Sequence, residues 1–350
     1  MRIGIVTLAG RFNYGNRLQA YATQRVLAKR GFDVVTLEAR DQTFTRRVMN
    51  MAKKVLRKPV SVEETLSEGR SEAFERFNSR IATKMTLIRD IHHDAYDCFV
   101  AGSDQVWNPS FVTFRHPEML TFAPPAKRVA LAASIGVSQI PEEDRDWIAR
   151  EVSGFAHISV RERRALEIVR ELTGRDAELV IDPTLAIDRE SWLGVADDRI
   201  TPSGSYVFTY LLGGVGEDER RVLNEVIRDG LSVIALTDRE GPNELPAGPA
   251  EFISLIANAS HVVTDSFHAS AFALLMGTPL TIVRRMGSSP DRDMFSRLES
   301  LSHTLGLERN VYDSSNFDFF VTGDYARSYE LLAMERKRLD AFLTRSLPRV

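Results

Sequence analysis

The sequence predicts an α/β protein with two parallel β-sheets, each covered by helices, that face one another across a cleft. Three observations support this fold class. The chain has 350 residues, which is enough for two domains with separate cores. Short apolar runs alternate with helix-like stretches in both halves. Polar residues follow most of these runs directly, as they do where ligands bind beyond the carboxyl ends of parallel strands.

The first half opens with a βαβ unit. A β-branched run predicts a strand over 2–8, apolar residues at helical spacing predict a helix over 16–31, and the next strand follows at 33–39. A helix is then expected within 63–81. Further strands are expected at 96–103, 128–134, 156–162 and 177–183, with helices at 142–155 and 163–174. This alternation favours a parallel sheet, because parallel strands need helical crossovers.

The polar stretch 188–204 marks a boundary between two Rossmann-like domains, predicted at 1–195 and 204–322. The second domain repeats the alternation, with apolar runs at 205–212, 231–236, 250–259, 261–266 and 279–283 and helices at 217–230 and 267–277. Residues 323–350 contain a long amphipathic helix, long enough to cross back to the first domain.

Composition excludes several classes of protein. The net charge is −3, and no basic face marks a nucleic-acid-binding protein. The one cysteine, Cys98, lies in an apolar run and is interpreted as a buried hydrophobe, with a reactive thiol as the alternative. The apolar start is too short to span a membrane, so we expect a cytoplasmic protein. The basic segment 45–60 fits a solvated helix better than a helix on the inner membrane face, and both stay open.

Polar residues at predicted strand ends are the candidates for the cleft. The loop from Gly10 to Gly15 lacks the Lys-Ser/Thr pair of a phosphate loop, and an anion site and a plain turn are equally compatible with it. Asp104 follows a middle strand, and Asp182 ends another, where organisation of the turn before Pro183 is an alternative role. The candidate cleft or acceptor-binding residues are Asn13, Tyr14, Gly15, Asn16, Arg17, Ser103, Asp104, Gln105, Trp107 and Asp182.

His268 stands where a buried strand becomes a helix. Ser266 is the expected N-cap, which places His268 in the first helical turn, where the helix dipole favours a bound anion. A hydrogen-bonded structural histidine and a functional histidine are about equally compatible with this position. No pair of histidines has metal-binding spacing, so we expect neither a metal ion nor another cofactor.

Arginines supply candidate anion ligands. Arg161 comes directly off a buried strand, and Arg284, Arg285, Arg292 and Arg297 cluster later in the chain. Guanidinium groups match the geometry of phosphate and carboxylate. For each of the last four, a solvated surface position is the favoured interpretation, whereas Arg161 is the stronger functional candidate.

These segments together resemble the polysaccharide pyruvyl transferase family. The matching pieces include "IGIVTLAGRFNYGNRLQAYATQRVLAKRGFDV", "DCFVAGSDQVWNP", "AASIGVSQIPEE", "ISVRERRALEIVRELTG", "LVIDPTL", "LIANASHVVTDSFHASAFALLMGTP" and "SRLESLSHTLGL". They occur in family order from Ile3 to about Leu307 and leave out the basic segment and the carboxyl-terminal helix. Each piece is weak alone, and the ordered set is specific.

The resemblance implies a fold similar to the two-domain GT-B glycosyltransferases. It also implies transfer of the pyruvyl group of phosphoenolpyruvate onto two hydroxyls of a sugar, as a cyclic ketal, in the synthesis of an exopolysaccharide or cell-envelope glycan. The acceptor is then a free, lipid-linked or nucleotide-linked glycan precursor. The oligomeric state is not determined by the sequence, and a homo-oligomer is compatible with it.

The resemblance also assigns residues. The histidine of the family maps onto His268 and its strand-end arginine onto Arg161, and these two are the expected catalytic residues. The expected donor-binding residues are Ser266, Phe267, Arg285, Ser296 and Arg297. Two departures stand out: Ala269 replaces a glycine, which adds a methyl near the pocket, and Asn16 and Arg17 replace small or apolar residues, which adds a cation.

Two alternative functions remain. A nucleotide-sugar-dependent glycosyltransferase would use the same two-domain frame. A catalytically silent module of a glycan-assembly complex would need none of the proposed chemistry, so its function would survive the substitution His268→Ala.

Overall fold

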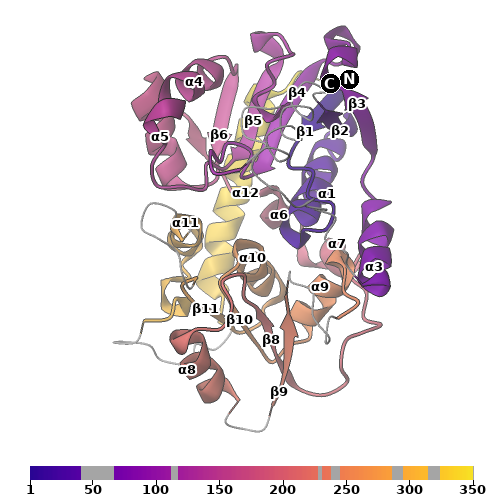
Figure 1. Ribbon diagram of the computed structural model, residues 1–350, viewed down its shortest axis with the longest axis vertical. Helices are drawn as coiled ribbons and strands as arrows, with labels where there is room; N and C mark the ends of the chain where they lie inside the picture. Colours follow the sequence, from indigo (N-terminus) through magenta and orange to yellow (C-terminus); the bar gives the residue numbers. More distant parts are fainter. Residues whose placement is uncertain are drawn as a thin grey trace, which may run out of the picture.

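The computed structural model describes residues 1–40, 67–111, 117–227, 231–237, 245–285, 295–313 and 324–349, which contain two parallel sheets (Figure 1). The basic segment 45–60 and Arg292 lie outside these ranges. Every pair of neighbouring strands in both sheets is parallel. The α/β class and the two parallel sheets are therefore confirmed.

The first sheet has seven strands in the order β3-β2-β1-β4-β5-β6-β7. The strands are β1 (Arg2–Val6), β2 (Asp33–Arg40), β3 (Thr83–Leu87), β4 (Cys98–Asp104), β5 (Arg128–Ala133), β6 (His157–Val160) and β7 (Glu178–Leu179). The helices of this half are α1 (Tyr14–Ala28), α3 (Glu68–Asn78), α4 (Glu142–Ser153), α5 (Arg163–Thr173), α6 (Pro183–Ala186) and α7 (Arg189–Leu193). The central strands β4 and β5 are buried along their whole length, which explains why they read as continuous apolar runs.

The second sheet has four strands in the order β11-β10-β8-β9. They are β8 (Tyr206–Tyr210), β9 (Ser232–Leu236), β10 (His261–Thr264) and β11 (Leu280–Ile282). The helices of this half and of the carboxyl end are α8 (Glu217–Val226), α9 (Pro249–Ala257), α10 (Phe267–Met276), α11 (Ser296–Leu305) and α12 (Ala326–Ser346). Helix α10 is buried over its whole length, because it lies between the second sheet and the first half of the molecule (Figure 1).

Some elements differ from the sequence prediction. The apolar run 250–259 was grouped with the strands and forms helix α9, because periodicity alone does not distinguish a short buried helix from a buried strand. Strand β3 was not predicted, because its residues are mostly exposed at the edge of the sheet and leave no buried apolar pattern. The stretch 188–204 was expected as an irregular linker and includes α7, which Asp188 caps by accepting a hydrogen bond from the backbone N–H of Ser191.

The two halves share one hydrophobic core. A single cluster of buried residues runs from Ile3 and Leu18 of the first half to Phe252 and Phe272 of the second. Tyr14 contributes strongly, since its ring stacks on Phe252 with centroids 5.1 Å apart.

Helices α3 and α12 also connect the halves. In α3, Arg70 Nη1 donates to the carbonyl of Thr237, 2.8 Å away, and Arg76 pairs with the buried Glu251. Helix α12 runs from the lower to the upper half in Figure 1, where Arg336 donates to the carbonyls of Leu185 and Ile187. None of the helices in the described ranges is both long and apolar enough to cross a membrane.

Candidate active site

A cavity of about 830 Å³ lies between the two sheets, beyond the carboxyl ends of their strands. Its size is within the usual range for small-molecule sites. The first half lines it with Leu8, Ala9, Gly10, Asn13, Gly15, Asn16, Asp104, Gln105 and Phe111. The second half lines it with Tyr210, Leu211, Leu212, Gly214, Thr237, Ser266, Phe267, His268, Arg285 and Arg297.

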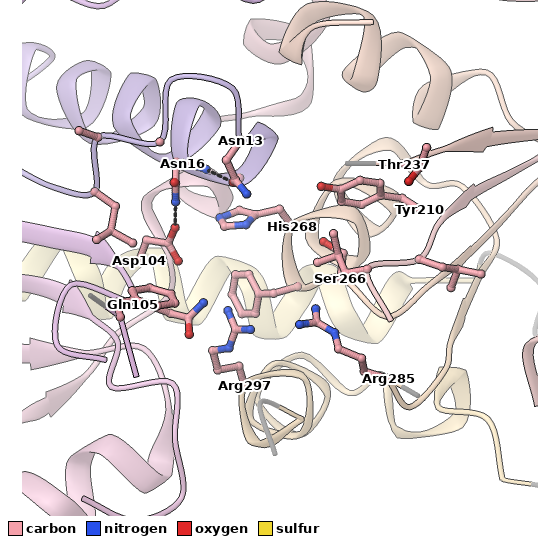
Figure 2. A pocket seen from close by; sticks show the side chains of 18 of the residues that line it. Asn13, Asn16, Asp104, Gln105, Tyr210, Thr237, Ser266, His268, Arg285 and Arg297 are labelled. Atoms are coloured by element: carbon pink, nitrogen blue, oxygen red, sulfur yellow. Dashed lines mark hydrogen bonds between the residues drawn. The ribbon is translucent and has the colours of Figure 1, made fainter. Parts of the chain in front are cut away.

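His268 lies at the centre of this cavity (Figure 2). Ser266 caps α10 as the sequence predicts, with its side chain accepting from the backbone N–H of Ala269, so His268 is in the first turn. The imidazole is only 7% exposed and packs directly on Gly15, where an added Cβ would lie 2.3 Å from Nδ1. Its Nε2 is buried and makes no hydrogen bond to the residues that the structure describes.

The pKa of His268 is lowered from its ordinary value. Burial is the largest cause; the carboxylates of Asp182 and Asp104 act in the opposite direction, and Arg161 and Arg297 lower the pKa further. The ligand-free imidazole is therefore mainly neutral at pH 7. An anion bound beside it would favour the protonated form.

Arg161 lies beneath the cavity and not in its wall. Its side chain is fully buried and donates to Asp104 Oδ1 at 2.7 Å and to Asp182 Oδ2 at 2.6 Å. The guanidinium carbon lies 4.5 Å from the centroid of the Phe267 ring, a cation–π arrangement. Both ends of the guanidinium fork are therefore occupied by carboxylates.

Asp104 and Asp182 are strongly held as carboxylates by this arrangement. Burial alone would raise the pKa of Asp182, but Arg161 and His268 outweigh it and lower that pKa to about 2. Asp182 also caps α6, accepting from the backbone N–H of Thr184, and it accepts from the hydroxyl of Ser103. The predicted candidates Asp182 and Ser103 thus support the cavity from below and do not line it.

Arg297 is the free cation of the site. It is 7% exposed, lines the cavity, and makes no ion pair with any residue in the described parts of the chain. Burial, followed by the charge of Arg161, lowers its pKa to about 10, so it stays charged at neutral pH. Arg285 also lines the cavity and donates from Nε to Asp265 Oδ2 at 3.2 Å. Ser296, the first residue of α11, does not line it.

The opposite wall carries amides and a carboxylate. Asn16 Nδ2 donates to Asp104 Oδ2, and Asn13 caps α1 by accepting from the backbone N–H of Asn16 at 3.0 Å. Gln105 lies beside them (Figure 2) and accepts from Asn108 Nδ2 at 2.7 Å. The cavity is therefore polar and cationic on one side, and polar with neutral amides and one carboxylate on the other.

Three other predicted cleft residues are buried and do not line the cavity. The hydroxyl of Tyr14 donates to the carbonyl of Ala247 in the second half, 2.8 Å away. Arg17 Nη2 donates to the carbonyl of Leu8 at 3.0 Å, and Trp107 packs edge-on against Phe155.

The substitution at Ala269 does not reach the cavity. Ala269 is fully buried in the shared core and is not among the lining residues, so the expected methyl near the pocket is not found there. The other departure from the family concerns Asn16 and Arg17; Asn16 lines the cavity and Arg17 does not.

Part of the wall was not predicted from the sequence, namely Leu8, Ala9, Phe111, Tyr210, Leu211, Leu212, Gly214 and Thr237. Tyr210 ends β8, and Thr237 directly follows β9. The strand-end rule that selected Asp104 would have found both.

Comparisons with solved structures find similar chains at low sequence identity. The UDP-GlcNAc 2-epimerase of Neisseria meningitidis is 11% identical with a TM-score of 0.46, over 100% of this chain and 95% of that one. The epimerase of Methanocaldococcus jannaschii is 11% identical with a TM-score of 0.43, over 98% and 99%. The calicheamicin glycosyltransferase CalG4 is 13% identical with a TM-score of 0.41, over 99% of each chain. No curated protein sequence matches the chain.

The family model for polysaccharide pyruvyl transferase matches residues 13–285. The match covers well over half of the chain, from the N-cap of α1 in the first half to Arg285 in the second. It includes the whole of α10 with His268 and the ion-pair cluster around Arg161. The chain therefore belongs to the polysaccharide pyruvyl transferase family and is a transferase.

Proposed function

We propose that this transferase moves the pyruvyl group of phosphoenolpyruvate onto two hydroxyls of a sugar in a glycan or glycan precursor, and releases phosphate. The family membership supports the reaction class. The observation that carries the donor is Arg297, a nearly buried cation without an ion-pair partner in the described chain, which lines the cavity together with His268. Such a cation is matched by the phosphate or the carboxylate of phosphoenolpyruvate.

The donor is placed on the cationic side. Arg297 and Arg285 supply guanidinium groups, and the first turn of α10 at Ser266 and Phe267 offers the positive end of a helix dipole. Ser296 begins α11 directly before Arg297, and we assign it to the support of that arginine.

The acceptor is placed on the amide side. Asn13, Asn16 and Gln105 present hydrogen-bonding groups that suit sugar hydroxyls, and Asp104 is an acceptor for one of them. Tyr210 and Leu212 line the cavity from the second half and give it apolar surface for the face of a sugar ring. In this proposal His268 acts between donor and acceptor, since it lines the same cavity as the residues of both groups.

The reaction needs one proton donor that can also accept a proton. His268, protonated when the anionic donor is bound, gives its proton to the methylene carbon of phosphoenolpyruvate, which becomes the methyl group. The first sugar hydroxyl forms a bond to the adjacent carbon and passes its proton to the now neutral His268. The carbon–oxygen bond to phosphate breaks, the second hydroxyl bonds to the same carbon, and its proton leaves with the phosphate. General acid–base catalysis of this kind contributes about 10² to 10⁴ in rate.

A nucleotide-sugar-dependent glycosyltransferase is less well supported. The glycine-containing loop after β8 would be the natural diphosphate site, but the backbone N–H groups of Leu212 and Gly213 already donate to the carboxylate of Asp265. The first turn of α8, which follows this loop, holds Glu217, Asp218 and Glu219 and would repel a diphosphate.

The experiment that tests the proposal is mass spectrometry of glycan precursors incubated with the protein and phosphoenolpyruvate. We expect the mass of a pyruvyl ketal to be gained with one inorganic phosphate released per transfer. No gain over a broad acceptor panel counts against the proposal. Thermal stabilisation by nucleotide sugars and not by phosphoenolpyruvate would favour the glycosyltransferase, and full function of His268→Ala would favour the silent module.

A cytoplasmic location is part of the proposal. Cys98 is the only cysteine, and it is 2% exposed, so it forms no internal disulfide. This usage is typical of proteins in reducing compartments. Contact with the inner membrane face through segment 45–60 is a separate hypothesis, tested by flotation of the protein with anionic vesicles.

A further inference from the structure

The cluster below the cavity links Arg161 to His268 without reaching the space that substrates occupy. Arg161 is 0% exposed at its side chain, and the carboxylates of Asp104 and Asp182 hold the two ends of its fork. Its guanidinium carbon lies over the ring of Phe267, 4.5 Å from the centroid, and this ring in turn meets the ring of His268 edge-on at 5.2 Å between centroids. The chain of contacts therefore runs from Arg161 through Phe267 to His268.

We infer that Arg161 is a positioning residue, which places His268 through Phe267 and the two carboxylates and does not bind the donor anion. This inference rests on the proposed function, since it assigns a part in the same site. Two facts favour it over direct binding. The Arg161 side chain has no accessible surface to offer a ligand. The nearby Arg297, by contrast, lines the cavity with its charge unpaired in the described chain.

His268 is held from the other side by the first half of the molecule. Gly15 contacts the imidazole so closely that an added Cβ would lie 2.3 Å from Nδ1. The imidazole thus lies between Gly15 of α1 on one side and Phe267, which contacts Arg161, on the other. Loss of either support frees it to move, and a displacement of about 1 Å can cost about 10²-fold in rate.

Arginine is required here for its shape as well as its charge. A lysine at position 161 would keep one positive charge between Asp104 and Asp182, but it cannot donate to both in a fork or stack a planar group on Phe267. Arg161→Lys therefore separates positioning from charge. Arg161→Met also removes the charge, which leaves the three buried carboxylates of Asp104, Asp182 and Glu162 without this partner and weakens the fold.

The first measurement separates donor binding from turnover. We expect Arg161→Lys to lower kcat about 10²-fold and to change the Kd of phosphoenolpyruvate by less than about threefold. Arg297→Lys is the contrast and should raise that Kd. Arg170→Met is the matched control, because Arg170 is a mostly exposed arginine of α5, and it should behave as wild type. A rise of tenfold or more in the Kd of Arg161→Lys, with kcat retained, would overturn the inference.

The second measurement needs no substrate. The protein has seven histidines, and His268→Gln identifies the ring resonances of His268 in a histidine-labelled sample. We expect Arg161→Lys and Phe267→Leu to shift these resonances, because both remove the stack, while Arg170→Met leaves them unchanged. Unchanged resonances in folded Arg161→Lys and Phe267→Leu would refute the inference. If the wild-type protein fails to bind phosphoenolpyruvate, the proposed function fails, and these spectra still decide the role of Arg161.

The titration of His268 gives a third readout. The ring is faced by Asp104 at the end of β4, Asp182 at the start of α6, Arg161 after β6 and Arg297 in α11. Removal of the Arg161 charge takes away one of the influences that lower the pKa of His268, while the two carboxylates still raise it. If Arg161→Met folds, its His268 should titrate at a higher pH than in wild type; a lower midpoint contradicts the contact scheme.

Discussion

The substitution Gly15→Ala tests whether the position of His268 controls turnover. Gly15 belongs to the first turn of α1, and a Cβ built there lies 2.3 Å from Nδ1, 2.8 Å from Cε1 and 3.1 Å from Cγ of His268. Ordinary contact begins near 3.4 Å, so the imidazole and the helix must separate by about 1 Å. A shift of this size at a catalytic group costs about 10²-fold in rate.

The effect of Gly15→Ala on stability is smaller, because two contributions oppose each other. Alanine favours a helix over glycine by about 0.5 to 1 kcal/mol. Overpacking of a buried contact costs about 1 to 3 kcal/mol. We therefore expect the free energy of unfolding to fall by no more than about 2.5 kcal/mol, so that most of the protein stays folded and the loss of rate is not a loss of protein.

The assay for Gly15→Ala is phosphate release and ketal formation under saturating donor, with thermal unfolding measured on the same sample. Gly204→Ala is the matched control, since nothing lies within 4 Å of a Cβ at that position and its backbone is not left-handed. It should keep the wild-type rate. A wild-type rate in Gly15→Ala would refute the argument that close packing on α1 places His268.

Three further predictions follow. Arg297→Met should raise the Kd of phosphoenolpyruvate about 10- to 100-fold, because it removes about 1.5 to 3 kcal/mol of charged hydrogen bonding. It should also raise the Tm of the ligand-free protein, because it removes a buried cation without an ion-pair partner in the described chain. Calorimetry measures both quantities, and a lower Tm contradicts the charge argument. Because the folded pKa of Asp182 is lowered to about 2, its stabilisation is complete above its unfolded pKa of about 3.9 and is lost as the pH falls towards 2. The stabilisation is about 2 to 3 kcal/mol, and acid unfolding of Asp182→Asn should lack that part of the pH dependence. Burial raises the pKa of the Cys98 thiol to about 12, so thiol reagents at pH 8 should label Cys98 only after denaturation; rapid labelling of the native protein would show an accessible thiol.

The local structure around His268 was determined by the sequence. Ser266 is a good N-cap after a β-branched strand, and Gly277 ends α10 in a left-handed conformation, so the helix limits follow from nearby residues. The two sheets were predicted for the same reason, since buried parallel strands appear as apolar runs. Strand β3 could not be predicted, because its pairing with β2 supplies the structure that its own exposed residues do not signal.

The roles within the site were decided only by the tertiary structure. Arg161 and Arg297 look alike in sequence, yet Arg161 is enclosed by Asp104 and Asp182 from other strands and helices, while Arg297 keeps its charge unpaired in the described chain. Residues far apart in the chain set these surroundings, and neither spacing nor motif encodes them. The contact of Gly15 with His268, across 253 positions of sequence, exists for the same reason: it forms only when the two halves pack on one core.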